Sequence, residues 1–282
     1  MRRETGLVQI AFLGTGGGRN VVLTQVRWTG GIRIIPGGAH LHIDPGPGAL
    51  VRSIEKKLSP QKVGAVLISH AHPDHYNDGE IFIEAMTAAM TKRQGTLIGP
   101  RSVLYGNDVC EPAISKYHQS MVEHVIEAKT DLNFDANNIQ VAATRAKHTD
   151  PDAVGYKLTF PGVGTVSYTS DTEYFQGIGE QYRGTRLLIL CTMRPRGDPW
   201  KGHMSTDDAV SIVEEAKPER AIITHFGMKM IKANPWREAA HIQEKTGTPI
   251  IAAYDGMILE MAGDIKEVRQ KVRGQTRLET LG

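Results

Sequence analysis

The sequence has few cysteines, almost no surplus of either charge and no long apolar run. Cys110 and Cys191 are the only cysteines among 282 residues, which excludes a disulfide framework and suits a reducing compartment. Lysine and arginine number 33 against 31 acidic residues, a net charge of +2 that argues against a surface devoted to nucleic acid. No apolar stretch approaches the ~18 residues of a membrane helix, and Gly14 interrupts the first apolar run too early for a secretory signal. We therefore expect a globular, cytoplasmic protein without a membrane partner.

Hydrophobic residues make up 40% of the chain, enough for a sizeable core, and they occur in short runs separated by glycine. These runs predict strands at 7–13, 31–35, 40–44, 63–69, 139–146, 154–160, 165–169, 187–191, 220–224, 249–253 and 257–261. Helical spacing predicts helices at 47–58, 80–90, 173–183, 205–216 and 236–245. The strands form two groups, 7–70 and 139–261, which favours two sheets packed together and covered by helices. We expect one domain over residues 1–262, followed by a polar, basic terminal helix or tail at 263–282.

The most informative string is HAHPDH at residues 70–75, directly after an apolar strand. Imidazole and carboxylate groups are costly to bury unpaired, and a strand exit followed by proline is a turn, so packing does not explain this string. His70 and His72 lie two residues apart and can converge on one cation. Asp74 and His75 point elsewhere and can serve a second. Such ligands suit Zn²⁺ or another borderline divalent metal, and the alternative is a polar turn that is rich in histidine by chance.

One turn cannot complete two metal shells, so this interpretation requires further histidine or aspartate residues at strand ends. Three such residues each follow a predicted strand: His148, Asp171 and His225. A single histidine at a strand end is usually an ordinary surface or hydrogen-bonded residue. The shared position of all three at the carboxyl ends of strands favours a common site.

HAHPDH, a later lone histidine, an SDT string and a final strand-end histidine together resemble the metallo-β-lactamase-fold superfamily of hydrolases, from residue 7 to about residue 261. The resemblance implies the α+β class and an αββα sandwich, in which two mixed sheets are flanked by helices and the site lies at one edge between them. It implies that one metal is held by His70, His72 and His148. It implies that the other is held by Asp74, His75 and His225, with Asp171 bridging the two.

The chemistry of such a centre agrees with the resemblance. Two cations about 3.5–4 Å apart can share a hydroxide whose pKa they lower toward ~7, which supplies a nucleophile at neutral pH. Asp74 is also placed to orient that hydroxide. Asp44, in HIDPGPG at another strand end, resembles the carboxylate with which the family holds a ligand histidine by its other N–H, although a turn cap before Pro45 explains it equally well. We expect two divalent metal ions, with Zn²⁺ as the first choice and Mn²⁺ or Fe as alternatives.

His203, in GHMST just before a predicted helix, bears on the substrate. Phosphodiesterase branches of the superfamily, which include tRNA 3′-processing endonucleases and small cyclic-phosphate phosphodiesterases, have a similar His-x-Ser/Thr element. An imidazole there can donate to a phosphoryl oxygen or protonate the departing alkoxide, so His203 joins Asp74 as a catalytic candidate. The preceding loop carries Arg194, Arg196 and Trp200, which could pair with phosphate and stack on a base. A hydrogen-bonding turn histidine and a solvated loop are the alternatives.

Two further features bear on RNA as a substrate. The segments FLGTGGGR and HTDPDAVGYKLTF are similar to segments of the tRNA 3′-endonucleases, and Arg19 in the first could pair with a phosphate. Those enzymes usually carry a long substrate-gripping arm between the positions that match His148 and Asp171, where this chain has only two predicted strands. Their HEAT-like element, expected after the strand at 187–190, is replaced by CTM. RNA therefore stays open but is not favoured, and a small or nucleotide-type phosphodiester is preferred.

The leading hypothesis is a metal-dependent hydrolase, specifically a dinuclear-metal phosphodiesterase in which a metal-bound hydroxide attacks phosphorus. The first alternatives are a tRNA 3′-processing endonuclease and a hydrolase of a carboxylic ester, thioester or lactam, for which His203 would be incidental. A metal-containing binding or sensor protein is a further alternative. Proteins of this fold commonly pair through a flat face, so a homodimer is a candidate assembly.

Overall fold

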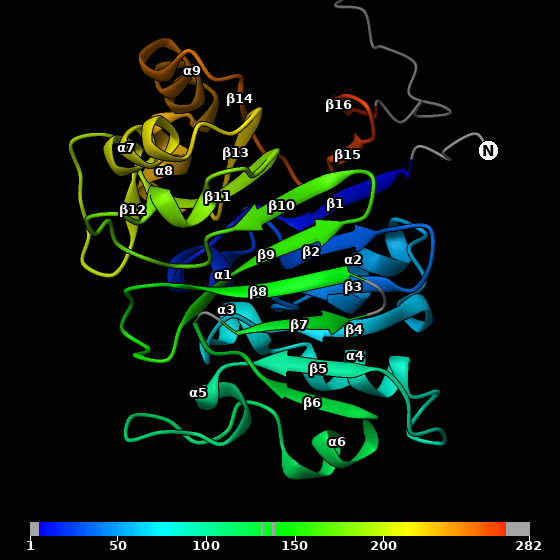
Figure 1. Ribbon diagram of the computed structural model, residues 1–282. Helices are drawn as coiled ribbons and strands as arrows, with labels where there is room; N and C mark the ends of the chain where they lie inside the picture. Colours follow the sequence, from blue (N-terminus) through cyan, green and yellow to red (C-terminus); the bar gives the residue numbers. More distant parts are fainter. Residues whose placement is uncertain (1–5, 131, 137–138, 269–282) are drawn as a thin grey trace, which may run out of the picture.

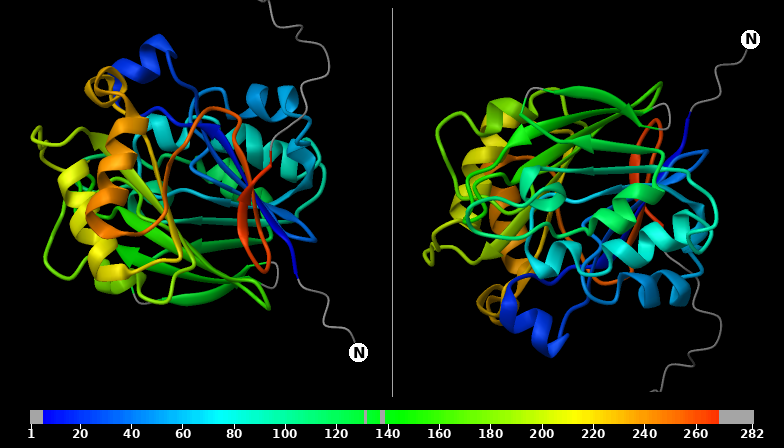
Figure 2. Two further views of the ribbon diagram at one scale, coloured as in Figure 1. Left: turned by 90° about the horizontal axis from the view of Figure 1, so that it is seen from above. Right: turned by 90° about the horizontal axis from the view of Figure 1, so that it is seen from below.

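Two facing sheets form the centre of the molecule, with helices over the outer face of the first sheet and over part of the outer face of the second, where β7 to β10 (residues 133–168) have no described helix in front of them (Figure 1). The computed structural model describes residues 6–130, 132–136 and 139–268. Views from above and below show the two sheets as inner layers between two outer layers of helices (Figure 2). This arrangement is the αββα sandwich that the sequence predicted.

The first sheet runs from the C-terminal hairpin, through the N-terminal strands, to a parallel half. In spatial order its strands are β16 (Ile265–Glu267), β15 (Ile258–Met261), β1 (Val8–Gly14), β2 (Thr29–Ile35), β3 (His40–Ile43), β4 (Val63–Leu67), β5 (Thr96–Gly99) and β6 (His124–Glu127). The last four are parallel, and the other neighbouring pairs are antiparallel. Parallel strands bring their carboxyl ends to one edge of a sheet, and HAHPDH leaves β4 at that edge.

The second sheet repeats this arrangement. Its strands, in spatial order, are β14 (Ile250–Ala252), β13 (Arg220–Thr224), β11 (Leu187–Arg194), β10 (Gly164–Tyr168), β9 (Val154–Phe160), β8 (Ile139–Arg145) and β7 (Asn133–Ala136), and β12 (Met204–Ser205) pairs with β11. β10, β11 and β13 are parallel, and β8 points the same way because β9 is antiparallel to both β8 and β10. β14 is parallel to β13, so five strands of this sheet end at one edge.

Alternate residues of the strands build the apolar layers. On β11, Leu187, Ile189 and Cys191 face the core between the sheets. Leu188 and Leu190, one position along, pack on the outer side. That side is covered by α7 (Thr206–Ala216), α8 (Met228–Ala233) and α9 (Pro235–Thr246). The outer face of the first sheet is covered mainly by α2 (Ala49–Glu55), α4 (Gly79–Met86), α5 (Arg101–Leu104) and α6 (Lys116–Met121).

The helix predicted at 173–183 is wrong. The structure has only a 3₁₀ turn there, Gly179–Tyr182. Gly177 has a φ of 81°, a left-handed conformation that ends a right-handed helix. A Cβ at Gly179 would lie 2.4 Å from the Cβ of Glu215, so glycine is required where this segment meets α7. Gly177 therefore breaks the helix through its backbone conformation, and Gly179 allows the close approach to α7.

Other boundaries differ from the predictions for local reasons. The helix predicted at 80–90 ends at Met86, because Ala88, Ala89 and Met90 have φ values of 52°, 56° and 61°. The strand predicted at 187–191 continues to Arg194. β5, β6, β7, β16 and several short helices were not predicted, and the strand predicted at 257–261 was assigned to the wrong group, since β15 pairs with β1.

The first residues of the C-terminal stretch belong to the first sheet. Ile265–Glu267 form β16, so the sheet extends past residue 262, where the domain was expected to end. The predicted helix or tail over 269–282 lies outside the described residues. None of the helices in the described ranges is long and apolar enough to cross a membrane.

Helix α7 provides a test of local stability. Ser205 and Asp208 form a capping box: the Ser205 Oγ accepts from the Asp208 N–H at 3.3 Å, and the Asp208 carboxylate accepts from the Ser205 N–H at 2.8 Å. We expect Ser205→Ala to lower the free energy of unfolding by about 1 kcal/mol, measured by urea denaturation. Ser211→Ala removes a hydroxyl inside the same helix and should cost clearly less. Equal losses in the two variants would contradict the capping role.

Candidate metal centre

Histidine and aspartate side chains gather where strands end at one edge of the sandwich. Asp44 follows β3, His148 lies three residues after β8, Asp171 three residues after β10, and His225 directly follows β13. Left-handed backbone is frequent here although the residues are not glycine: φ is 50° at Asp44, 58° at Ser170 and 60° at His225. Such conformations persist only where the surrounding structure imposes them, and they cluster at functional sites.

HAHPDH leaves β4 as a turn that becomes helix α3 (Pro73–Tyr76). Pro73 suits the first helical position, because an N–H there would have no partner within the helix. The turn is held by Asp150, whose Oδ2 accepts a hydrogen bond from the Ala71 N–H at 2.9 Å. The HTDPD segment after β8 thus fixes the turn that carries the first histidines.

The first group of ligand-type atoms belongs to His70, His72 and His148, whose ligand nitrogens lie within 4.8 Å of one another. The Nε2 of His70 is 3.0 Å from the Nδ1 of His72, and the Nε2 of His148 is 3.1 Å from that same Nδ1. The outer Nδ1 of His148 donates to the carbonyl of Gly202 at 2.7 Å, which fixes the ring with its other nitrogen inward.

The second group consists of Asp74, His75 and His225, whose ligand atoms also lie within 4.8 Å of one another. The Nε2 of His225 lies 3.1 Å from the Nε2 of His75 and 3.4 Å from the Oδ2 of Asp74. Asp171 lies between the groups: its Oδ2 is 3.6 Å from the Nε2 of His75 and 3.9 Å from the Nε2 of His148. The structure therefore brings together all seven side chains that the sequence proposed as metal ligands.

Burial and proximity set the protonation states of the cluster. Burial lowers the pKa of His148 to about 4 and holds the pKa of His70 well below its usual range, so both rings are neutral near pH 7. Burial opposes ionisation of Asp171, but the imidazoles of His225 and His75 outweigh it and keep the pKa of this carboxyl well below its ordinary value. Neutral imidazoles and ionised carboxylates are the forms that bind a divalent cation.

Two observations test whether the cluster fits a metal. Three buried ligand-type atoms of this cluster have no hydrogen-bond partner among the described residues: Asp171 Oδ1, His203 Nδ1 and His225 Nδ1. Burial lowers the pKa of His75, but the carboxylates of Asp44 and Asp74 raise it well above its usual value, so this ring carries a proton next to them. A divalent cation would provide both the missing contacts and the positive charge. The residues therefore fit a metal centre.

Asp44 lies behind His75 and joins the two sheets. Its Oδ2 accepts from the Nδ1 of His75 at 2.8 Å, from the Ser69 hydroxyl at 2.7 Å and from the Tyr168 hydroxyl at 2.7 Å. Its Oδ1 accepts from the Ser69 N–H at 2.7 Å. Of the two interpretations that the sequence left open for Asp44, the structure has the contact with His75. Ser69 and Tyr168 were missed, because no motif around them signals a contact that only the packed sheets create.

His203 lies beside the cluster. Its Nδ1 is 3.3 Å from the Oδ2 of Asp171, and its ring meets that of His148 edge-on, with centroids 4.9 Å apart. Ligand-type atoms of His148, Asp171 and His203 also lie within 4.8 Å of one another, so the geometry permits His203 to act as a metal ligand as well as in proton transfer. Glu173 was not predicted from the sequence. Its carboxylate accepts a hydrogen bond from the Gly202 N–H at 2.7 Å, which helps to position the Gly202 carbonyl that accepts from His148.

The two arginines in the loop between β11 and β12, Arg194 and Arg196, contact other groups of the protein. Arg194 forms an ion pair with Asp198 at 2.5 Å, and its guanidinium lies 5.1 Å from the centroid of the Trp200 ring. Arg196 turns toward α9, where its NH1 is 2.9 Å from the Nδ1 of His241. Protein groups therefore pair with both arginines, and their contact with an anionic ligand stays a prediction. Trp200 remains 58% exposed.

The glycine-rich turn between β1 and α1 (Arg19–Thr24) touches the cluster directly. A Cβ at Gly17 would lie 2.2 Å from ring atoms of His225, so only glycine leaves room for that imidazole. The N–H of Gly18 donates to the Oδ2 of Asp74 at 3.0 Å. These contacts give the turn a role in shaping the cluster, whereas Arg19 itself is exposed.

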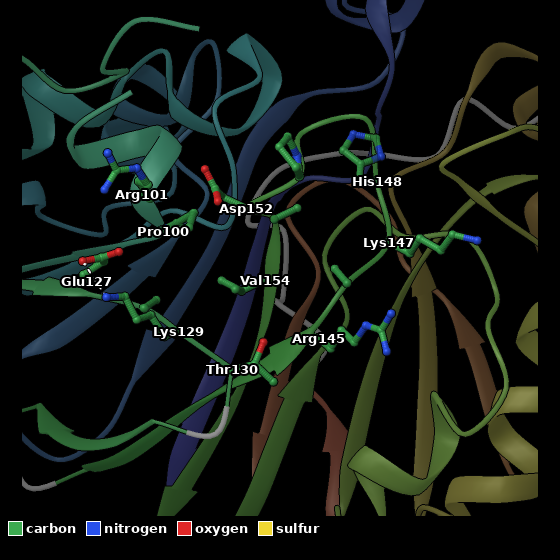
Figure 3. A pocket seen from close by; sticks show the side chains of 14 residues that line it. Pro100, Arg101, Glu127, Lys129, Thr130, Arg145, Lys147, His148, Asp152 and Val154 are labelled. Atoms are coloured by element: carbon green, nitrogen blue, oxygen red, sulfur yellow. Dashed lines mark ion pairs between the residues drawn. The ribbon is translucent and has the colours of Figure 1, made fainter. Parts of the chain in front are cut away.

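A groove of about 710 Å³ opens beside His148 (Figure 3). It lies between the carboxyl ends of β5 and β6 and the segment that joins β8 to β9. Its charged lining residues are Arg101, Lys129, Arg145, Lys147, Glu127 and Asp152. Lys129 pairs with Glu127 at 3.1 Å, and Lys147 pairs with Glu173 at 2.7 Å. No described residue forms an ion pair with Arg101 or Arg145, although the guanidinium of Arg145 lies 5.0 Å from the centroid of the Phe175 ring.

Comparisons with known proteins place these observations in a family. A model described as a beta-lactamase superfamily domain matches residues 40–226. An uncharacterised protein of Methanocaldococcus jannaschii is 42% identical over 256 residues, which cover 90% of this chain and 95% of that protein. A ribonuclease Z of Pyrococcus horikoshii is 29% identical over 151 residues, which cover 53% of this chain and 47% of the relative.

Solved structures show the same fold at low sequence identity. The metallo-beta-lactamase fold protein YhfI from Bacillus subtilis superposes with a TM-score of 0.72 at 19% identity, covering 90% of this chain and 99% of that one. A diphosphatase of the PhnP family superposes with a TM-score of 0.65 at 17% identity, covering 90% of this chain and 97% of that one. These matches confirm the metallo-β-lactamase fold that the sequence resembled.

The glycine turn generates a test of the cluster. We expect Gly17→Ala to push the His225 ring out of place and to reduce the metal bound per chain, measured by atomic emission after loading with zinc and desalting. Gly37→Ala is the matched control, because a Cβ at Gly37 would meet nothing within 4 Å. Circular dichroism should show both variants folded. Metal content that is unchanged in Gly17→Ala would contradict the role of His225.

Proposed function

Because the chain belongs to the metallo-β-lactamase-fold superfamily, we propose that it is a dinuclear-metal phosphodiesterase acting on a small or nucleotide-type phosphodiester. That it is a metal-dependent hydrolase follows from the family and its relatives. The observation that supports phosphodiester chemistry is the position of His203, whose imidazole lies 3.3 Å from Asp171 inside the candidate centre. A hydrolase of simpler esters has no need of this residue.

The centre would hold its metals on two sides of Asp171. His70, His72 and His148 would bind one divalent cation, and Asp74, His75 and His225 would bind the other. When bound, the cations would lower the pKa of a coordinated water and neutralise charge on phosphoryl oxygens, and Zn²⁺ suits the imidazole-rich set best. Asp44 would keep His75 oriented through the hydrogen bond to its Nδ1.

His203 would act on the leaving group. Its Nδ1 is directed at Asp171, which leaves the Nε2 as the nitrogen available to a substrate, and the side chain retains 16% exposure. An imidazole with one nitrogen beside a carboxylate has a fixed ring orientation, so the other nitrogen can face the substrate. His203 is therefore suited to protonate the departing alkoxide as the phosphorus–oxygen bond breaks.

The groove beside His148 supports a substrate that extends past the scissile phosphate. Arg101 and Arg145 line it without ion-pair partners among the described residues, and guanidinium groups bind phosphate through paired hydrogen bonds. A nucleotide-type diester would place a base or a further phosphate there. We expect no membrane involvement. A homodimer remains the prediction for the assembly state.

RNA remains the alternative substrate within the same chemistry. A ribonuclease Z is among the relatives, and its match covers less than half of that enzyme. In this chain the residues between His148 and Asp171 form β9 and β10 of the second sheet, so they provide no extended arm for gripping tRNA. Hydrolysis of a carboxylic ester, thioester or lactam is the other alternative, and no contact in the site favours it.

Substitution of His203 tests the proposed reaction. With zinc or manganese bound, we expect the wild type to hydrolyse a chromogenic phosphodiester or a 2′,3′-cyclic phosphate. His203→Ala should lower kcat by about 10²–10⁴-fold with metal content unchanged, because proton transfer to the leaving oxygen is lost. His124→Ala, a change at a 64% exposed side chain, is the control. Metal-loaded wild type that cleaves a thioester but no phosphodiester would reject the proposal.

Substitution of Arg145 tests the groove. We expect Arg145→Ala to raise KM for a dinucleotide phosphodiester roughly threefold to tenfold and to leave turnover of the small chromogenic diester unchanged. Arg101→Ala should act in the same direction. Arg237→Ala removes an exposed arginine from α9 and controls for net charge. Equal changes for both substrates, or for Arg237→Ala, would show that the groove does not bind the substrate.

A further inference from the structure

We infer that Cys191 supplies a thiolate ligand to the cation site that Asp171 and His225 share. The inference concerns which metals the centre accepts. It rests on the metal centre of the proposed function, but not on the reaction proposed for that centre.

Cys191 reaches the centre from the middle of the second sheet. On β11 it belongs to the row that faces the other sheet, and it pairs in register with Thr224 on β13, the residue directly before His225. Its Sγ, a ligand nitrogen of His225 and a carboxylate oxygen of Asp171 all lie within 4.8 Å of one another. Ligand atoms bound about 2.0–2.3 Å from one zinc ion are at most about 4.6 Å apart, so a small adjustment brings the three onto one ion.

The partners of Cys191 are buried and unsatisfied. Exposure is 2% for Cys191, 2% for Asp171 and 7% for His225. Asp171 Oδ1 and His225 Nδ1 are 3.2 Å apart, and neither has a hydrogen-bond partner among the described residues. A cavity of about 30 Å³, with room for one water-sized atom, is lined in part by Cys191, His225 and Asp74. Unsatisfied polar atoms beside free space indicate an ion rather than a packed apolar core.

Metal binding by Cys191 is a simple ligand exchange. The S–H bond breaks, a sulfur–metal bond forms and the proton passes to solvent, with no change in oxidation state. A thiolate is a soft ligand that favours Zn²⁺ and Co²⁺ over Mn²⁺ and Mg²⁺. The group of His70, His72 and His148 includes no sulfur, so the two sites differ in the metals they prefer. The site next to Cys191 is the one that selects a thiophilic metal.

Cobalt absorption spectroscopy of the full-length protein tests this inference. Protein stripped of metal is loaded with Co²⁺, because a thiolate–cobalt bond gives a near-ultraviolet charge-transfer band that imidazole and carboxylate ligands do not give. We expect the band in the wild type and in Cys110→Ser, and its loss in Cys191→Ser with cobalt still bound. Cys110 is the matched control, since its Sγ lies 3.4 Å from the Oδ1 of Asn107 and belongs to none of the metal-type groups among the described residues.

Each outcome decides the inference. Wild-type protein that binds cobalt without the band, a band that persists in Cys191→Ser, or no cobalt binding at all would overturn it. The wild-type spectrum is decisive even if Cys191→Ser fails to fold. Bound cobalt without the band, together with phosphodiester turnover, would reject the thiolate ligand and keep the proposed reaction. The band without turnover of any phosphodiester would support the ligand and reject the reaction.

Discussion

The hydrogen bonds to the carboxylate of Asp44 are the contact on which the arrangement of the site depends. Asp44 directly follows β3 of the first sheet, Ser69 lies two residues after β4 beside it, and Tyr168 contacts the same carboxylate from β10 of the second sheet. The fourth donor is His75, so the carboxylate that connects the two sheets also orients an imidazole of the cluster. A buried carboxylate is stable only with such donors, and its need for them fixes how closely the two strand edges approach.

The cluster at this edge is costly for a folded chain without cations. Imidazoles and carboxylates are buried at contact distance, and three of their atoms lack partners among the described residues. The backbone at Asp44 and His225 is left-handed, and Gly17 leaves out a side chain so that the ring of His225 fits. Each feature lowers stability by itself. Together they are the features expected of a site that could hold a metal ion.

The sequence predicted the ligands better than their surroundings. HAHPDH and the strand-end residues His148, Asp171 and His225 could be found because packing gives no reason for polar groups there. Tyr168 could not be found as a partner of Asp44, because the contact exists only once the sheets pack. The helix predicted at 173–183 failed because Gly177 has a left-handed backbone and Gly179 packs against α7, and the pairing of Arg194 with Asp198 could not be read from the sequence. Two-sheet architecture followed from strand spacing, whereas the return of β15 to the first sheet did not.

The central claim is that seven side chains from both halves of the sandwich hold a pair of divalent cations. Anomalous diffraction at the zinc edge, from crystals of the zinc-loaded protein, tests this claim most directly. The account predicts two anomalous peaks about 3.5–4 Å apart on either side of the Asp171 carboxylate. A map with no peak at this edge, or with zinc bound only elsewhere on the protein, would contradict it.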